Sequence, residues 1–402
     1  MTPRTPLPDP FAPADLGPIT LRNRLIKCAT FEGMTPDAVV TDELVEFHRE
    51  VAAGGVGMST VAYCAIAPEG RTDRHQIWMR PEEAAGLARL TEAIHDEGAK
   101  AAAQLGHAGA VANSASNHRK ALGPSRIPAP MGMSLTHKVT PTEIRELTRT
   151  FAKAARIAVD SGFDGLEIHC GHNYLLSSFF SPLLNRRRDA YGGSLVNRAR
   201  FAREVLEAVR AEVGSEVAIW AKLGLYDGAP GGLQIDEACQ IAQLLEGDGH
   251  LDAIEPTAGS SLLNPMYLFH GRAPRKEFAA AFSGALKAGL KVAGPVFLKH
   301  YPYRDAYLLP LARQLRQAVD LPLILLGGIT DRATIDMALS DGFDFVAMGR
   351  ALLREPDLPH LLAVDPTAHS KCTHCNLCMP TIYSKTRCPI RTGEVSDPLA
   401  SA

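Results

Sequence analysis

Residues 163–176 read FDGLEIHCGHNYLL, and this stretch decides the fold. Residues 164–169 fit a short strand, and the residues before them fit a helix. Residues 140–143, TPTE, combine a capping box with proline at the first helical position, and Gly162 stands where a glycine ends a helix. A helix that leads directly into a buried strand indicates an α/β architecture.

The same pairing of strand and helix recurs along the chain. The candidate strands are 25–30, 56–61, 99–105, 164–169, 217–223, 252–257, 321–326 and 343–348. The candidate helices are 81–97, 140–162, 194–213, 235–246, 303–319 and 331–340. The strands are continuous rather than alternating, which is typical of parallel strands buried on both faces. The pattern predicts a (β/α)8 TIM barrel rather than a doubly wound sheet.

Length and charge are compatible with one large enzyme domain. A chain of 402 residues is long for a single core, but (β/α)8 barrels with insertions reach this size. The net charge of −2 offers no basic field for nucleic acid or an anionic membrane. No run approaches the roughly 18 apolar residues of a membrane span, and the proline-rich start lacks the apolar core of a signal peptide. We therefore expect a cytoplasmic protein that acts on small molecules.

Two segments depart from the minimal repeat of the barrel. They are the loop 106–140 and the insertion at about 258–300. Both follow predicted strands, so both are expected on the C-terminal face, where barrel active sites are built. We expect residues 1–360 to form the barrel and residues 361–402 to form a cysteine-containing C-terminal arm.

The end of the strand at 164–169 carries the clearest chemistry. His169 and His172 place two hydrogen-bond donors at the barrel mouth, and Tyr174 adds a phenol that can donate a proton. This trio at a strand end predicts a catalytic site rather than three structural side chains. A metal site on the two histidines is the alternative, but no third ligand stands nearby.

Glycines and an arginine follow the last two strands. Gly328 comes after the strand at 321–326, and Gly349 and Arg350 come after the strand at 343–348. Glycine lets backbone N–H groups approach an anion, and arginine adds a fork of donors. The pattern predicts a ligand that carries a phosphate. No Gly-x-Gly-x-x-Gly follows a strand, so a Rossmann-bound dinucleotide is not indicated.

Two long polar side chains, Gln104 and Lys222, lie inside predicted strands. Burying them is costly unless they are paired. The N3, O2 and N1 edge of a flavin ring would pair both. The alternative is a buried ion pair between Lys222 and an acidic residue such as Glu167.

The chain resembles the Old Yellow Enzyme family of FMN-dependent ene reductases over nearly its whole length. The segments that carry the resemblance are LGPITLRNRL, HREVAAGGVGM, APEGR at 67–71, QLGHAG at 104–109, residues 163–201, LLGGIT and VAMGRALLREPDL. The resemblance implies FMN as cofactor and NAD(P)H as reductant. It also implies roles for single residues.

Ala29, Thr30, Phe31 and Tyr63 match positions that line the flavin. Gln104 and Lys222 match those that hold its pyrimidine end, and Gly328, Gly349 and Arg350 match the phosphate site. His169 and His172 match the pair that grips the carbonyl or nitro oxygen of the substrate, and Tyr174 matches the proton donor. Three positions depart from the family: Lys222 is more often Arg, Phe31 stands where Cys or Thr often bonds flavin O4, and Ala110 stands where Arg is common.

The implied reaction is a ping-pong exchange. NAD(P)H passes a hydride to FMN and leaves as NAD(P)+, and an activated alkene takes its place over the ring. The two histidines stabilise charge on the oxygen of this α,β-unsaturated carbonyl or nitro compound while hydride reaches the β-carbon. Tyr174 then protonates the α-carbon.

Four of the eight cysteines stand close together near the end of the chain. They are Cys372, Cys375, Cys378 and Cys388. Their spacing suits a [4Fe–4S] cluster or a zinc site, and an unmetallated thiol-rich arm is a third interpretation. The first part of the motif is similar to the cluster motifs of trimethylamine dehydrogenase and, less closely, 2,4-dienoyl-CoA reductase.

Other functions stay open at this point. An iron–sulfur amine dehydrogenase or demethylase would want Tyr at position 169, where this chain has His169. A metal-dependent barrel hydrolase would use His169 and His172. A non-catalytic flavin carrier would not need the complete donor set. The sequence also leaves open the particular alkene, the choice between NADH and NADPH, and a homo-oligomeric state.

Overall fold

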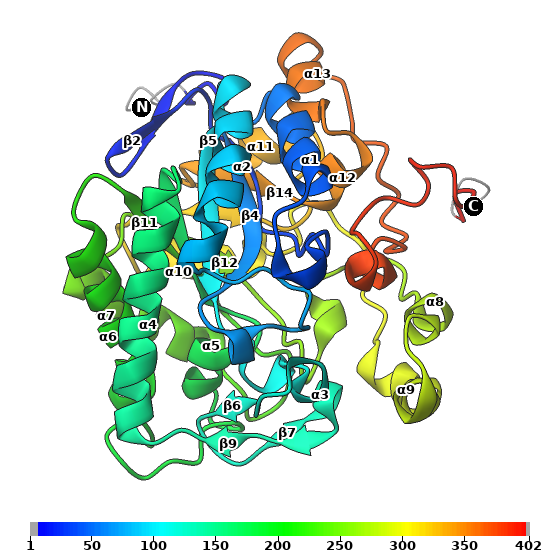
Figure 1. Ribbon diagram of the computed structural model, residues 1–402. Coiled ribbons are helices and arrows are strands. Elements are labelled where there is room, and N and C mark those ends of the chain that lie inside the picture. Colours follow the sequence, from blue (N-terminus) through cyan, green and yellow to red (C-terminus); the bar gives the residue numbers. More distant parts are fainter. Residues whose placement is uncertain (1–6, 399–402) are drawn as a thin grey trace.

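An eight-stranded parallel sheet forms the centre of the computed structural model, which describes residues 7–398 (Figure 1). The strands are β3 (Leu25–Lys27), β4 (Met58–Ala65), β5 (Lys100–Gly106), β10 (Gly165–Cys170), β11 (Ala218–Gly224), β12 (Ala253–Thr257), β13 (Ile324–Leu326) and β14 (Phe345–Met348). β14 pairs with β3, and a bridge from Ile254 to Leu323 joins β12 to β13, so the sheet closes on itself. The eight predicted strands and the TIM barrel are confirmed.

Helices surround this barrel. The long ones are α1 (Asp42–Ala53), α2 (Ala84–Asp96), α4 (Pro141–Asp160), α6 (Leu195–Val213), α7 (Ile235–Asp248), α10 (Leu309–Arg316) and α11 (Arg332–Ser340). The predicted capping box starts α4: Glu143 N donates to Thr140 Oγ1 at 3.2 Å, and Thr140 N donates to Glu143 Oε2 at 2.6 Å. Helix α1 was not predicted, and its buried face includes His48.

A hairpin of β1 (Ala14–Leu16) and β2 (Ile19–Leu21) covers the N-terminal end of the barrel. Leu16 and Leu21 are fully buried and pack in one cluster with Trp220 and Phe345. The hairpin was not predicted, because three-residue strands are too short to show a pattern. Residues 1–6, which begin the proline-rich segment of the targeting prediction, lie outside the described residues, as do residues 399–402.

Three segments meet over the C-terminal end of the barrel. The loop 106–140 contains the short strands β6 (Leu122–Gly123), β7 (Pro128–Ala129), β8 (Ser134–Leu135) and β9 (His137–Lys138). The insertion folds into α8 (Arg275–Ala280) and α9 (Gly284–Phe297), which lie beside the C-terminal arm (Figure 1). The arm is fastened to the barrel side, since Thr386 N donates to Glu32 O at 2.7 Å.

None of the described helices is long and apolar enough to cross a membrane.

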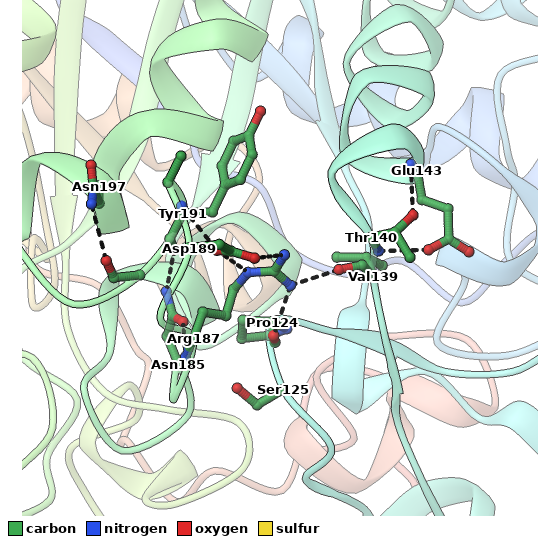
Figure 2. A network of polar contacts seen from close by, with 12 residues as sticks. Pro124, Ser125, Val139, Thr140, Glu143, Asn185, Arg187, Asp189, Tyr191 and Asn197 are labelled. Carbon is green, nitrogen blue, oxygen red and sulfur yellow. Dashed lines mark hydrogen bonds and ion pairs between the residues drawn. The ribbon is translucent and has the colours of Figure 1, made fainter.

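A buried arginine ties the loop 106–140 to the segment that follows β10 (Figure 2). The Nη1 atom of Arg187 donates to Pro124 O at 3.0 Å and to Val139 O at 2.6 Å. Its Nε and Nη2 atoms form a two-point contact with the Asp189 carboxylate, at 2.9 and 2.7 Å. Backbone carbonyls far apart in the sequence are therefore satisfied by one side chain, which fixes the loop over the barrel mouth.

Candidate active site

The turn after β10 positions the predicted catalytic trio. His169 lies in the strand, and His172 and Asn173 follow with φ of 60° and 57°. This left-handed backbone is uncommon for non-glycine residues, although histidine and asparagine adopt it more often than most. The Asn173 amide donates to Asp227 Oδ1 at 2.9 Å, and His172 O accepts from Ser261 N at 3.0 Å, so the segments that follow β11 and β12 hold the turn.

The three rings of the trio lie against one another. The rings of His169 and Tyr174 stack with centroids 4.4 Å apart and planes at 8°, and the His172 ring lies 5.2 Å from His169, edge on. His169 Nδ1 accepts from Gly171 N at 3.2 Å, so a neutral ring carries its proton on Nε2. His172 Nε2 lies 2.8 Å from Thr257 Oγ1, at the end of β12.

Burial keeps all three groups neutral near pH 7. Burial, followed by the charges of His172 and Lys222, holds the pKa of His169 well below its usual value. Burial and the Lys222 charge lower the pKa of His172 to about 3. Burial also raises the pKa of the Tyr174 phenol, which therefore keeps its proton. The site offers hydrogen-bond donors without a positive charge.

A cavity of about 370 Å³ opens at this end of the barrel, and its lining is mostly apolar. The barrel residues predicted to bind cofactor or substrate all line it: Ala29, Thr30, Phe31, Tyr63, Gln104, His169, His172, Tyr174, Lys222, Gly328, Gly349 and Arg350. Ala110 lies elsewhere, in a small apolar cluster with Ile127 and Leu184. Residues that were predicted from motifs far apart in the sequence therefore line one cavity.

Other residues of the lining were not predicted. Thr257 is the last residue of the buried strand β12. A polar residue at the end of a strand is the sequence signal that could have identified it. The insertion contributes Phe278, Phe282, Leu286, Leu290 and Phe297, and the arm contributes His374, Cys378, Met379, Ile382 and Tyr383. The sequence placed the insertion at this face of the barrel and predicted Cys378 only as a metal ligand. The other side chains were not predictable, because no periodic pattern encodes contacts between segments so far apart in the chain.

The donor set fits a flavin. Thr30 Oγ1 lines the cavity, is buried, and has no hydrogen-bond partner among the described residues. A buried hydroxyl without a partner is costly, and a polar ring edge would satisfy it. At the other end, Gly328 has φ of 85° and an added Cβ would lie 2.8 Å from Ala306 N, so only glycine fits there.

Lys222 lies in a buried ion-pair cluster. Its Nζ atom is 2.6 Å from Glu167 Oε1 and also bonds to Glu255, while Gln104 Nε2 donates to Glu167 Oε2 at 2.7 Å. The structure thus contains the Lys222–Glu167 pair that the sequence left as an alternative, and Gln104 and Lys222 also line the cavity. Burial opposes the charge of Lys222, but the two carboxylates outweigh it and raise its pKa. Burial and the Glu167 charge raise the pKa of Glu255.

The four clustered cysteines line a second, smaller cavity of about 20 Å³. Arg350 and Cys378 line both cavities, and Arg354 and Lys371 also face the smaller one. Burial raises the pKa of Cys378 to about 12, and the Arg350 charge opposes it. Between residues 7 and 398, no three His, Cys, Asp or Glu side chains converge closely enough to hold a single metal ion.

Comparisons with known proteins agree with this geometry. A family model described as the NADH:flavin oxidoreductase / NADH oxidase family matches residues 9–254. A 4,4'-dithiodibutanoate disulfide reductase from Rhodococcus erythropolis is 53% identical over 386 residues, which cover 96% of each chain. A metal reductase from Desulforamulus reducens is 34% identical over 91% of this chain and 50% of its own length.

Solved structures share the fold at lower identity. A 2-naphthoyl-CoA reductase in complex with 2-naphthoyl-CoA has a TM-score of 0.81 at 24% identity, over 96% of this chain and 57% of that one. An old yellow enzyme homologue from Zymomonas mobilis has a TM-score of 0.70 at 23% identity, over 98% of this chain and 100% of that one. The chain therefore spans about half the length of the metal reductase and little more than half of the naphthoyl-CoA reductase.

Proposed function

Because the chain belongs to the NADH:flavin oxidoreductase / NADH oxidase family, we propose that it uses FMN and NAD(P)H to reduce a small electrophile at the mouth of its barrel. The family resemblance inferred from the sequence is confirmed, and it favours an oxidoreductase over the barrel hydrolase. The observation that carries the proposal is the single cavity that gathers the predicted flavin residues and the neutral donor trio.

The residues for each part of FMN follow from the lining. Thr30, Gln104 and Lys222 would meet the polar edge of the ring, and Gly328 and Arg350 would meet the phosphate. Bound there, FMN would supply hydride transfer from the nicotinamide to the acceptor. The apolar remainder of the cavity excludes water from this exchange.

The donor trio best supports reduction of an activated C=C bond. The Nε2–H of His169 and an N–H of His172 would bind the carbonyl or nitro oxygen of the substrate and stabilise the negative charge that develops on it. The neutral phenol of Tyr174 would protonate the α-carbon. An α,β-unsaturated carbonyl or nitro compound is therefore the proposed substrate class.

A second candidate is the reduction of a small organic disulfide. It is favoured by the relative from Rhodococcus erythropolis, which is similar over 96% of both chains. Such a reduction consumes a hydride and a proton and gives two thiols. The Tyr174 phenol would protonate the departing thiolate, and the histidines would bind a polar group of the substrate.

Rapid mixing under anaerobic conditions tests both candidates. The purified protein should show flavin absorbance that NADH or NADPH bleaches. The reduced protein is then mixed with 2-cyclohexen-1-one or with 4,4'-dithiodibutanoate, and the return of flavin absorbance is followed. Faster return with the enone supports ene reduction, and faster return with the disulfide supports the second candidate. A colourless protein that cannot take up FMN contradicts the whole proposal.

We further propose that the four cysteines hold a [4Fe–4S] cluster. They share one cavity, and Arg350, Arg354 and Lys371 would offset the negative charge of four thiolates. Such a cluster would carry electrons. An iron–sulfur amine dehydrogenase or demethylase would use it in this way, so that enzyme class stays an alternative. Free thiols are the main alternative, and zinc is disfavoured because no three of the described ligand side chains converge on a single ion. Iron and sulfide analysis, with the visible spectrum after flavin removal, distinguishes the three.

A further inference from the structure

Asn376 lies in the middle of the cysteine motif and joins three parts of the molecule. It is 2% exposed, and its Nδ2 atom donates to Phe269 O at 2.8 Å and to Arg272 O at 2.9 Å. Its Oδ1 atom accepts a hydrogen bond from Arg350 Nη1. Its φ is 59°, a left-handed conformation that asparagine tolerates better than most residues. The arm, the insertion and the end of β14 thus share one side chain.

Arg350 lies between the two cavities. It lines the large cavity beside Gly328 and Gly349, and the small cavity beside Cys372. Its Nη1 atom donates to Asn376 Oδ1 and, at 2.8 Å, to His270 O. Because a guanidinium is planar, two acceptors on one nitrogen fix the orientation of the whole group. That orientation is therefore set by residues of the arm and the insertion.

We infer that Asn376 is a positioning residue for cofactor recognition, which orients the Arg350 guanidinium to receive the FMN phosphate. The inference rests on the proposed flavin function. Bidentate contacts between arginine and phosphate depend on geometry, so an arginine that loses its support keeps its charge but loses part of its affinity. The cysteine arm would then contribute to FMN binding without touching the ring.

A purely structural role for Asn376 makes a different prediction. If the side chain only held the arm in place, its loss would disturb the cavity as a whole and weaken every flavin equally. If it orients Arg350, its loss weakens only ligands that carry a phosphate. Riboflavin has the same ring and side chain as FMN without the phosphate, so it separates the two roles.

The experiment measures dissociation constants of FMN and riboflavin for the flavin-free protein, by quenching of flavin fluorescence. We expect Asn376→Ala to weaken FMN about tenfold and to leave riboflavin within about twofold, since a hydrogen bond to a charged group contributes about that much. Asn376→Asp keeps an acceptor for Arg350 but adds a carboxylate that competes with the phosphate, so it should lower FMN affinity at least as much. Arg350→Lys should lower the preference for FMN in the same way.

Asn185 provides the matched control. It is also buried, and its Nδ2 atom likewise donates to two backbone carbonyls, of Phe179 and Tyr191, both at 2.8 Å. Asn185→Ala should leave the ratio of the two constants unchanged. Equal weakening of FMN and riboflavin in both Asn376 variants, or no weakening of either, overturns the inference. A wild-type protein that binds neither flavin overturns the proposed function instead.

Discussion

At the scale of single residues, the site depends on burial that keeps its donors uncharged. His169 and Tyr174 lie face to face, and the pKa of the histidine is lowered while that of the phenol is raised. Each ring therefore keeps the protonation state in which it donates a hydrogen bond to a neutral substrate. Burial is the main reason that a positive imidazolium is avoided, and the buried cation of Lys222 nearby adds to the effect.

Tyr174→Phe tests the proton donor. The variant keeps the stacking ring but loses the O–H, so the reduction of an enone by the reduced enzyme should slow by about 100-fold or more. Bleaching of the flavin by NADH should stay within about twofold of wild type. Both half-reactions are measured separately by stopped-flow absorbance. An equal loss in both would assign the hydroxyl to flavin binding rather than to proton transfer.

The neutral histidines predict a flat pH profile. The pKa of His172 is lowered to about 3, so protonation of its ring is complete only below that pH. We expect kcat/KM for an uncharged enone in the oxidative half-reaction to change less than about threefold between pH 5.5 and 8.5. A sigmoidal step centred near pH 6.5, which is the ordinary histidine value, would show that a cationic imidazole takes part.

At the scale of elements, the functional cavity is completed by segments outside the repeating strands and helices. The hairpin of α8 and α9 contributes apolar side chains, and Phe282 packs edge on against Tyr383 of the arm at 5.1 Å. The loop 106–140, which comes much earlier in the sequence, contributes Val111 and Met131. The barrel strands contribute the polar side chains of the cavity, and these segments form the rest of its wall.

The α8–α9 hairpin should favour substrates with an apolar chain. Leu290→Ala removes apolar surface from the cavity wall, and we expect the KM for a long-chain enal with a ten-carbon chain to rise about tenfold. The KM for the short enal crotonaldehyde should change less than about twofold, because this molecule is too short to contact the helix. Val292→Ala, at a position 84% exposed on the same helix, is the control. A similar change for both substrates would contradict a binding role for the hairpin.

Arg187 should matter for both stability and binding. Arg187→Ala leaves the carbonyls of Pro124 and Val139 without their donor and should lower the free energy of unfolding by about 3 kcal/mol. The loop 106–140 should also loosen and raise the KM for the substrate. Urea unfolding and steady-state kinetics measure the two effects. The exposed neighbour Arg188 is the control, and its alanine variant should stay within about 0.5 kcal/mol.

At the scale of the whole molecule, several buried histidines make the fold sensitive to acid. Burial lowers the pKa of His48 and His169, and that of His107, His172 and His374 to about 3. In the unfolded chain they titrate near pH 6.5. Below that pH the unfolded state binds more protons than the folded state, so stability falls as the pH falls.

His107→Asn isolates one of these groups. Asparagine offers an oxygen for the bond that Gly109 N makes to His107 Nδ1 at 3.0 Å, but it does not titrate. Between pH 6.5 and 4.5 the variant should lose less unfolding free energy than wild type, by roughly 2 kcal/mol. Urea titrations at the two pH values measure the difference. The same loss in both proteins would show that His107 is not held neutral.

The barrel and the place of the His169, His172 and Tyr174 side chains at its mouth were predictable from local signals, and the surrounding contacts were not. The strand and turn at 163–176 carry their own pattern, so the positions of His169 and Tyr174 follow from the sequence. The ion pairs of Lys222 did not, because a flavin edge and a carboxylate explain a buried lysine equally well. The hydrogen bonds of Asn376 reach Phe269 and Arg272, which lie 107 and 104 positions earlier in the chain. No periodic pattern encodes contacts over such a separation.

Because β14 pairs with β3, the barrel cannot close until almost the whole chain has been synthesised. Beside these strands, Arg24 Nη1 bonds to Asp344 O, 320 residues further along. A ribosome adding about 5 to 20 residues per second needs roughly 16 to 64 seconds to make that stretch. Throughout this time one edge of β3 has no partner and is open to pairing with other chains. We therefore expect the nascent chain to be most prone to aggregation through this edge of β3 before β14 has been made.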